Sequence, residues 1–183
     1  DTVDGAALAV QMEQALGTAI EREVAVDASI AQTLAQAGAL WALRENISEA
    51  QRREGPNIKH DISLPVSAIP QFLHDAEKAL RAALPGVRFV VFGHLGDGNL
   101  HYNLAAPEGV DARAFLEETP VANRSVHDLV TGFGGSISAE HGIGQLKRIE
   151  LTRYKAPLEI ALMQKLKHAL DPRGLFNPGK VVG

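Results

Sequence analysis

Two histidines near the middle of the chain have the type and spacing to bind one metal ion. His94 and His101 flank the dipeptide Asp97-Gly98, which is typical of a two-residue type I′ hairpin turn because both central positions need a positive φ. Such a turn places His94 directly opposite His101, with Cβ atoms roughly 4.5–5.5 Å apart. Two imidazoles at that separation can bind one metal ion at about 2.0–2.1 Å each. The spacing therefore predicts a hairpin that carries part of a metal site.

A third ligand is offered by the segment 136–140. If this segment is a strand with Ile137 and Ala139 towards the core, Glu140 points to the same side as the two histidines. Two histidines and one glutamate with an open position form a catalytic ligand set, and zinc, manganese and iron all accept it. The alternative is that both histidines are solvated or hydrogen-bonded and bind no metal.

His141 is a candidate general base. It follows Glu140 and precedes Gly142, where the sequence predicts the start of a helix. The positive end of a helix dipole disfavours the imidazolium and keeps a histidine neutral, which is the state that a general base needs. A histidine at this place can also cap the helix without any catalytic role, and the local pattern alone favours the cap.

The elements that must position these side chains follow from the hydrophobic periodicity. Strands are predicted at 23–26, 59–66 and 136–140, together with a hairpin over 87–104. Helices are predicted over residues 1–16, 31–46, 67–84, 112–132 with an interruption near Pro120, 142–154 and 158–170. The helix positions expected in the core are Leu8, Met12, Leu16, Leu34, Leu40, Trp41, Leu43, Phe72, Leu73, Ala76, Leu80 and Leu84.

These elements predict an α+β fold in one domain spanning residues 1–183. A tight hairpin requires antiparallel pairing, and strands and helices do not alternate as regularly as in a doubly wound fold. The expected architecture is an antiparallel sheet with helices packed on one face.

Composition argues against several function classes. The net charge is −4 and no basic stripe is interleaved with aromatic residues, which argues against a nucleic-acid partner. No apolar run is long enough for a transmembrane segment. The chain has no cysteine, so it has no disulfide or thiolate metal site, which fits a cytoplasmic location, at most peripheral to a membrane. The first residue is Asp1 rather than Met, which we interpret as a cut inside a longer protein.

Three motifs occur in order along the chain: His94-Leu-Gly-Asp-Gly-Asn-Leu-His-Tyr-Asn103, Ser138-Ala-Glu-His-Gly-Ile-Gly144 and Phe176-Asn-Pro-Gly-Lys180. Together they resemble the C-terminal domain of FAD-linked oxidases, in the branch with D-lactate dehydrogenase, the glycolate oxidase flavin subunit and D-2-hydroxyglutarate dehydrogenase. The resemblance runs from about Ala31 to the end. It implies a ferredoxin-like cap domain that covers a flavin, with the FAD-binding domain on the N-terminal side. No Rossmann or P-loop glycine motif for a phosphate is present in this sequence.

The resemblance also implies roles for single residues. A divalent metal, zinc or manganese, would be bound by His94, His101 and Glu140, with His141 as the general base. The implied substrate-binding and cofactor-binding positions are Arg44, Ser48, Lys59 and Asn103 for the substrate, and Asn177 and Lys180 for the flavin side. The alternative for Arg44 and Lys59 is an exposed surface charge, and for Asn177 and Lys180 a simple C-terminal turn. His60 stands where many members have tyrosine, and no function is attached to it.

The implied function is that of the substrate- and metal-binding domain of an FAD-dependent D-2-hydroxy-acid dehydrogenase. A guanidinium binds a carboxylate through two hydrogen bonds and a lysine adds a point charge, while the flavin accepts the hydride. We expect the 183-residue chain alone to be inactive and to bind no FAD stably. Two alternatives stay open: a stand-alone metal- or ligand-binding module, and a docking domain in a multi-subunit oxidase. An open sheet edge would favour a homodimer.

Overall fold

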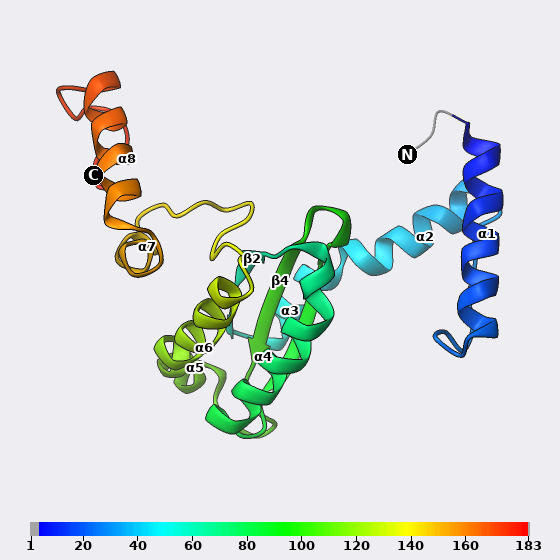
Figure 1. Cartoon of the computed structure of the whole chain (residues 1–183). Helices are drawn as coiled ribbons and strands as arrows, with labels where there is room; N and C mark the ends of the chain where they lie inside the picture. The colour runs from blue at the N-terminus through cyan, green and yellow to red at the C-terminus, as the bar shows by residue number, and fades with distance from the viewer. Residues whose placement is uncertain (1–3, 183) are drawn as a thin grey trace. The chain divides into compact units, whose positions relative to one another are not determined.

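The computed structural model of the chain describes residues 4–182, which form two compact units, residues 4–54 and residues 55–182 (Figure 1). The first unit is helical. Helix α1 (Gly5–Glu21) begins after Asp4, whose side chain accepts hydrogen bonds from the first backbone N–H groups of the helix. Helix α2 (Leu34–Glu45) begins with a capping box at Thr33, and α3 (Ile47–Glu54) follows it.

Two predictions for the first unit are wrong. The strand expected at 23–26 is a turn, because the N–H groups of Val24 and Ala25 bond back to the carbonyl of Ala19 and so finish helix α1. The apolar positions of the first two helices are not core: Leu34 is 93% exposed and Trp41 is 64% exposed. Periodicity identifies the apolar face of a helix, but burial needs a second layer to cover that face.

The second unit is built on an antiparallel sheet, as predicted. Strand β4 (Asn99–Ala105) is central and pairs with β3 (Arg88–His94) along one edge. Its other edge pairs with β1 (Asn57–Ile58) and β2 (Asp61–Ser63). Of the single strand expected over 59–66, only β2 forms, and the short β1 lies directly before that range.

The hairpin register differs from the prediction. His94 pairs with Asn99, and Phe92 pairs with His101. Instead of a two-residue turn, a 3-10 turn over Leu95–Asp97 and then Gly98, at φ 70°, connect the strands. The pairing is shifted by two residues, and side chains alternate with a period of two, so both histidines still share one face. They are diagonal neighbours rather than directly opposite each other.

The opposite face of the sheet forms the core with two helices, α4 (Ile69–Ala83) and α6 (Thr119–Gly132). A 3-10 turn, Val66–Ala68, precedes α4. Figure 1 shows both helices in front of β4. The core prediction is confirmed for α4: Phe72, Ala76 and Leu80 are fully buried. The helix predicted over 112–132 is interrupted as expected, into α5 (Ala112–Phe115), a 3-10 turn (Leu116–Glu118) and α6.

The chain after α6 has less regular structure than expected. The strand predicted at 136–140 is wrong, since its only pairing is an isolated bridge between Ser136 and Ser63. The helix predicted from Gly142 begins only at α7 (Arg148–Tyr154), because Gly142 and Gly144 have positive φ. Helix α8 (Pro157–Leu170) follows close to its predicted bounds. Among residues 4–182, no helix has the length and hydropathy to cross a membrane.

Candidate metal and substrate site

The three predicted metal ligands come together at one end of the hairpin. His94 Nδ1 lies 2.8 Å from Glu140 Oε1, and His101 Nε2 lies 3.8 Å from Glu140 Oε2. The two imidazole centroids are 6.4 Å apart. Ligand atoms around a tetrahedral zinc ion with bonds of about 2.0–2.1 Å are separated by about 3.3–3.4 Å, and the two observed distances bracket that value. The two distances from Glu140 are thus compatible with a shared divalent metal ion, but the ligand atoms of all three residues do not lie within 4.8 Å of one another. Metal binding by His94, His101 and Glu140 stays a prediction.

The ligand set is accessible from one side. The side chain of His101 is 16% exposed, whereas those of His94 and Glu140 are 51% and 43% exposed. Phe92 covers His101, with ring centroids 4.9 Å apart. A metal ion held by these three side chains would have room for a further ligand on the exposed side, as a catalytic site requires.

His141 lies beside this set. Its ring centroid is 5.9 Å from that of His101, and its Nδ1 is 3.6 Å from Asp61 Oδ2. The side chain is 68% exposed, so it can reach a ligand in solution. The helix expected to begin at Gly142 is not formed there, so the predicted effect of a helix dipole on His141 is wrong. The charged group next to its ring is a carboxylate instead.

Asp61 is a site residue that was not predicted from the sequence. This residue is buried on β2 and accepts three backbone hydrogen bonds at Oδ2, from Ala139 (3.3 Å), Glu140 (2.9 Å) and His141 (2.8 Å). Its Oδ1 accepts a fourth, from the side chain of Asn99 at 3.0 Å. Burial by itself raises the pKa of Asp61, but the N–H groups of His141 and Glu140 outweigh it and hold the pKa below its ordinary value.

Ligand atoms of Asp61, Glu140 and His141 also lie within 4.8 Å of one another, which raises the question of whether Asp61 is itself a ligand. Its carboxylate already accepts four hydrogen bonds, and its side chain is only 3% exposed. We therefore assign Asp61 to the support of the site. The available signal was strand alternation, which places Asp61 on the same strand face as Lys59.

The predicted substrate-binding residues divide between the two units. Asn103 is buried on β4, two residues from His101 and on the same strand face. Lys59 is exposed and lies between β1 and β2. Arg44 lies in the last turn of α2 and Ser48 in α3, so both belong to the first unit. The substrate roles of all four residues stay predictions.

Comparison with known proteins identifies the family of the chain. The family described as FAD linked oxidases, C-terminal domain, matches residues 2–181. The chain belongs to this family. D-2-hydroxyglutarate dehydrogenase of Xanthomonas citri pv. viticola is 42% identical over 167 residues, which cover 91% of this chain and 35% of that protein. The enzyme of the same name from Stutzerimonas stutzeri is 40% identical, with 92% of this chain and 37% of that protein covered.

A mitochondrial D-2-hydroxyglutarate dehydrogenase of Arabidopsis thaliana is 40% identical over 94% of this chain and 29% of its own length. The chain thus spans about a third of the length of the curated relatives it matches. The α+β sheet with helices on one face agrees with the predicted fold of this family's C-terminal domain.

In this FAD-linked oxidase domain the C-terminal tail packs beside the site loop. The backbone N–H of Val181 donates to the carbonyl of Gly144, and Lys180 Nζ donates to Gln145 Oε1 at 2.9 Å. Asn177 has a positive φ of 46°, as a turn residue often does. The tail is thus a turn, as the simpler alternative expected. Flavin contacts of Asn177 and Lys180 stay predictions.

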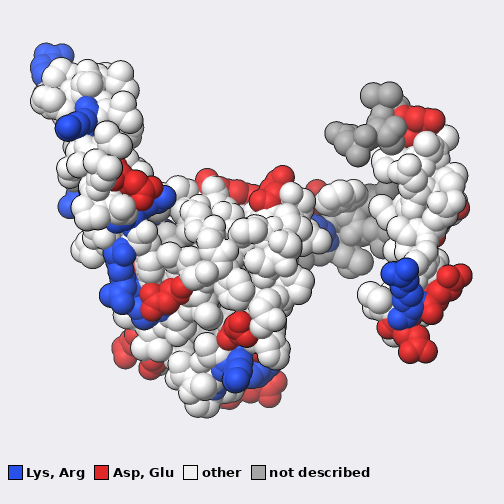
Figure 2. All heavy atoms as spheres, viewed as in Figure 1, with Lys and Arg blue, Asp and Glu red and all other residues white. Residues whose placement is uncertain are grey.

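A second polar cluster, also missed, joins α6 to α7. His60 Nδ1 contacts the carbonyl of Tyr102 and its Nε2 contacts Asn123, while the His60 and His127 rings meet edge to face at 5.7 Å. The remaining contacts are His127 with Glu150, Arg124 with Glu150 and Tyr154, and Tyr154 with Asp128. On the face drawn in Figure 2, basic and acidic side chains lie side by side near α6 and α7.

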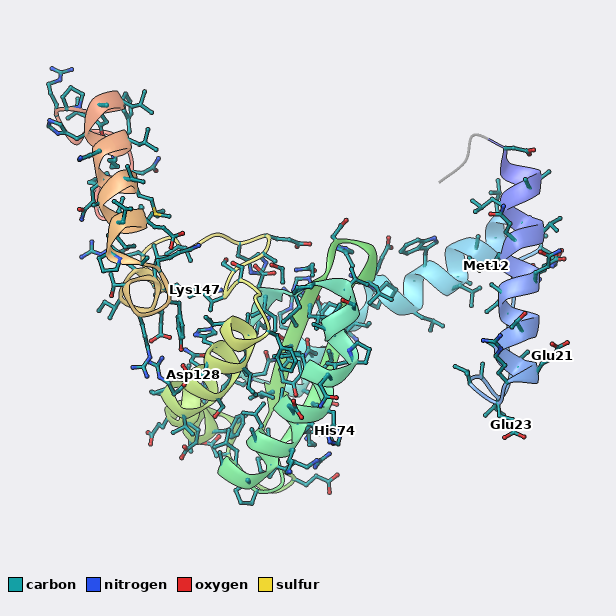
Figure 3. The ribbon with its side chains drawn as sticks, in the orientation of Figure 1. Met12, Glu21, Glu23, His74, Asp128 and Lys147 are labelled. Atoms are coloured by element: carbon teal, nitrogen blue, oxygen red, sulfur yellow. The ribbon has the colours of Figure 1, made fainter. Side chains whose placement is uncertain are left out.

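This cluster supports the loop from the far side of the sheet. Lys147, labelled in Figure 3 with Asp128, precedes α7 and donates from Nζ to the carbonyl of Ile137 at 2.8 Å. The residues that fix α7 on α6 therefore also fix the end of the segment that carries Glu140 and His141. His60 points into this core rather than to the site.

Proposed function

We propose that the chain is the substrate- and metal-binding domain of an FAD-dependent D-2-hydroxy-acid dehydrogenase. The observation that carries the proposal is the convergence of His94, His101 and Glu140, with His141 beside them. Family membership supports the link to FAD. The names of the relatives favour D-2-hydroxyglutarate as the substrate. We further propose that an FAD-binding domain on the N-terminal side completes the enzyme.

The reaction removes a proton from the substrate hydroxyl and a hydride from C2, and yields a 2-oxo acid and reduced flavin. A divalent metal at His94, His101 and Glu140 would supply Lewis acidity that lowers the pKa of the hydroxyl, and FAD would accept the hydride. His141 accepts the proton at its exposed ring. A base must be within reach of the proton that it removes, and the exposed position of His141 beside His101 satisfies this condition.

We propose that Asn103 on the sheet and Lys59 between the short strands bind the substrate. Arg44 and Ser48, which belong to the first unit, keep the substrate-binding roles predicted from the sequence. A 2-hydroxy dicarboxylic acid has two carboxylates, and one cation for each explains why both an arginine and a lysine are needed. Asn103 offers amide hydrogen bonds close to the histidines. The 2-hydroxy acids differ in the group beyond C2, so these residues set the choice among them.

Metal binding is tested on the full chain with zinc titrated against a chelating dye. We expect one equivalent to bind, and His101→Ala to weaken the affinity at least 100-fold, because losing a first ligand removes more than the 10–100-fold typical of an outer-sphere change. The matched control is His74→Ala, an exposed histidine on α4 that is labelled in Figure 3, and it should bind like the wild type. Unchanged affinity in His101→Ala would refute the metal centre.

Turnover is tested on the full-length flavoprotein that contains this chain, with D-2-hydroxyglutarate, D-lactate and glycolate, before and after chelation. We expect D-2-hydroxyglutarate to be oxidised fastest and the chelator to abolish turnover. The 183-residue chain alone should show none. Metal binding without flavin in any longer form of the protein would favour the stand-alone module, and copurification with a second subunit would favour the docking domain.

The expectation of a cytoplasmic location stays a prediction. The names of several eukaryotic relatives place them in mitochondria.

A further inference from the structure

We propose that Asp61 is a positioning residue, which fixes Glu140 and His141 through their backbone and whose negative charge favours one tautomer of the nearby His101 ring. The inference rests on the proposed metal centre and deepens it. Asp61 belongs to β2, within the sheet, whereas the segment with Glu140 and His141 is neither strand nor helix. A buried carboxylate on a strand of the sheet therefore holds the backbone of an irregular loop in place through hydrogen bonds.

The backbone contact is the first step. Three successive N–H groups, of Ala139, Glu140 and His141, converge on Oδ2 of Asp61. Convergent N–H groups of this kind form a concave anion site. Gly142 follows at a positive φ, so the chain turns away directly after the site. The three hydrogen bonds thereby set the place from which the Glu140 side chain reaches both histidines.

The ring contact is the second step. Asp61 pairs with His101 in the β2–β4 register, and Asp61 Oδ1 lies 3.9 Å from His101 Nδ1. His101 Nε2 faces Glu140 Oε2 on the other side. A carboxylate near one ring nitrogen favours the proton on that nitrogen and leaves the lone pair of the other for a metal. Asp61 therefore favours the tautomer in which Nε2 can bind the ion.

The surroundings of Asp61 also predict that asparagine is a poor replacement. Oδ2 faces three N–H donors, and Oδ1 faces the amide donor of Asn99. An amide at position 61 has no negative charge, so it accepts weaker hydrogen bonds from the three N–H groups. Its NH₂ group would also face the NH₂ group of Asn99, unless Asn99 flips to present its buried Oδ1. A second substitution, Asn99→Asp, restores the match, because the new carboxylate accepts from the amide at position 61.

The experiment measures zinc affinity of the full chain with a chelating dye, and the tautomer of His101 by ¹⁵N–¹H correlation of the imidazoles. Asp61→Asn should weaken zinc affinity about 10–100-fold and move the His101 proton from Nδ1 towards Nε2. Asp61→Asn/Asn99→Asp should recover about tenfold or more of that loss. The control is Asp75→Asn, a carboxylate on α4 that accepts a hydrogen bond from Gln71, and it should match the wild type.

The outcomes separate this inference from the proposed function. Wild-type affinity in Asp61→Asn, when His101→Ala has lost the metal, would overturn the role of Asp61 and leave the metal centre intact. A wild-type chain that binds no zinc would overturn both. If Asp61→Asn does not fold, Asn99→Ala and the double variant decide. Unchanged affinity in Asn99→Ala together with no recovery in the double variant then overturns the role.

Discussion

Acidification is expected to destabilise the sheet unit through His60. This histidine is 1% exposed, and burial is the main reason why its pKa falls to about 4 from 6.5. The nearby rings and charges of His127 and Lys147 lower it further, while the carbonyl of Tyr102 and the side chain of Asn123 act in the opposite direction. The folded protein therefore holds His60 neutral at a pH where an unfolded chain protonates it.

The sign and size follow from proton linkage. Between pH 6.5 and pH 4 the unfolded chain binds more protons at His60 than the folded chain, so the free energy of unfolding falls as the pH falls. The stabilisation is fully present above pH 6.5 and is lost by about pH 4. The difference of about 2.5 pKa units corresponds to about 3 kcal/mol, of which about 2 kcal/mol is lost between pH 7 and pH 5. A loss of this size is a large part of the stability of a typical domain.

The assay compares the wild type with His60→Gln, which keeps hydrogen-bonding atoms but cannot titrate. Urea unfolding is followed by far-UV circular dichroism from pH 7 to pH 4. The only tryptophan, Trp41, lies in the other unit, so hydrogen exchange of β4 peptides assigns the transition to the sheet. The wild type should lose about 3 kcal/mol more than the variant over this range. Parallel curves would refute the reasoning.

Two further predictions concern the turn and the tail. Gly98→Ala should destabilise the sheet unit by more than about 2 kcal/mol in urea unfolding, because the new Cβ would lie 2.0 Å from the carbonyl oxygen of Leu64 at a φ of +70°. Gly96→Ala in the same turn has no atom within 4 Å of its Cβ and should cost less than about 1 kcal/mol; equal effects would contradict this. The hydrogen bond from Lys167, with backbone N–H groups of the tail, lowers the pKa of Asp171 to about 2. The stabilisation of the tail by ionised Asp171 is therefore fully present above pH 3.8 and is lost as the pH falls through about 2. Asp171→Asn should accordingly speed hydrogen exchange of the tail at pH 7 but not below pH 2.

The shared face of the metal ligands could be predicted from the sequence even though the turn could not. A dipeptide whose two residues tolerate a positive φ favours a type I′ turn. In the structure, however, the backbone N–H of Leu64 donates to the carbonyl of Gly98, and the carbonyl oxygen of Leu64 lies so close to Gly98 that a side chain there would clash with it. That tertiary contact selects the longer turn. The resulting shift of two residues preserves the face of each side chain, so His94 and His101 still meet Glu140.

Burial was predictable where a sheet covers a helix and not elsewhere. Phe72 and Leu80 lie two helical turns apart on one face of α4, and Leu34 and Trp41 lie two helical turns apart on one face of α2, yet the first pair is buried and the second is exposed. The difference lies in what faces the helix, because α4 has the sheet and α6 against it. Periodicity contains no information about a covering layer.

Asp61 shows why the support of a site is harder to predict than its ligands. Strand alternation placed it on the polar face with Lys59, and on most sheets that face is solvated. Here the loop after Ser136 crosses that face and directs three N–H groups at the carboxylate. The loop approaches only because Ser136 pairs with Ser63, two residues beyond Asp61. An isolated bridge between two single residues cannot be derived from hydrophobic periodicity. The role of a residue that depends on such a bridge can therefore be recognised only in the folded structure.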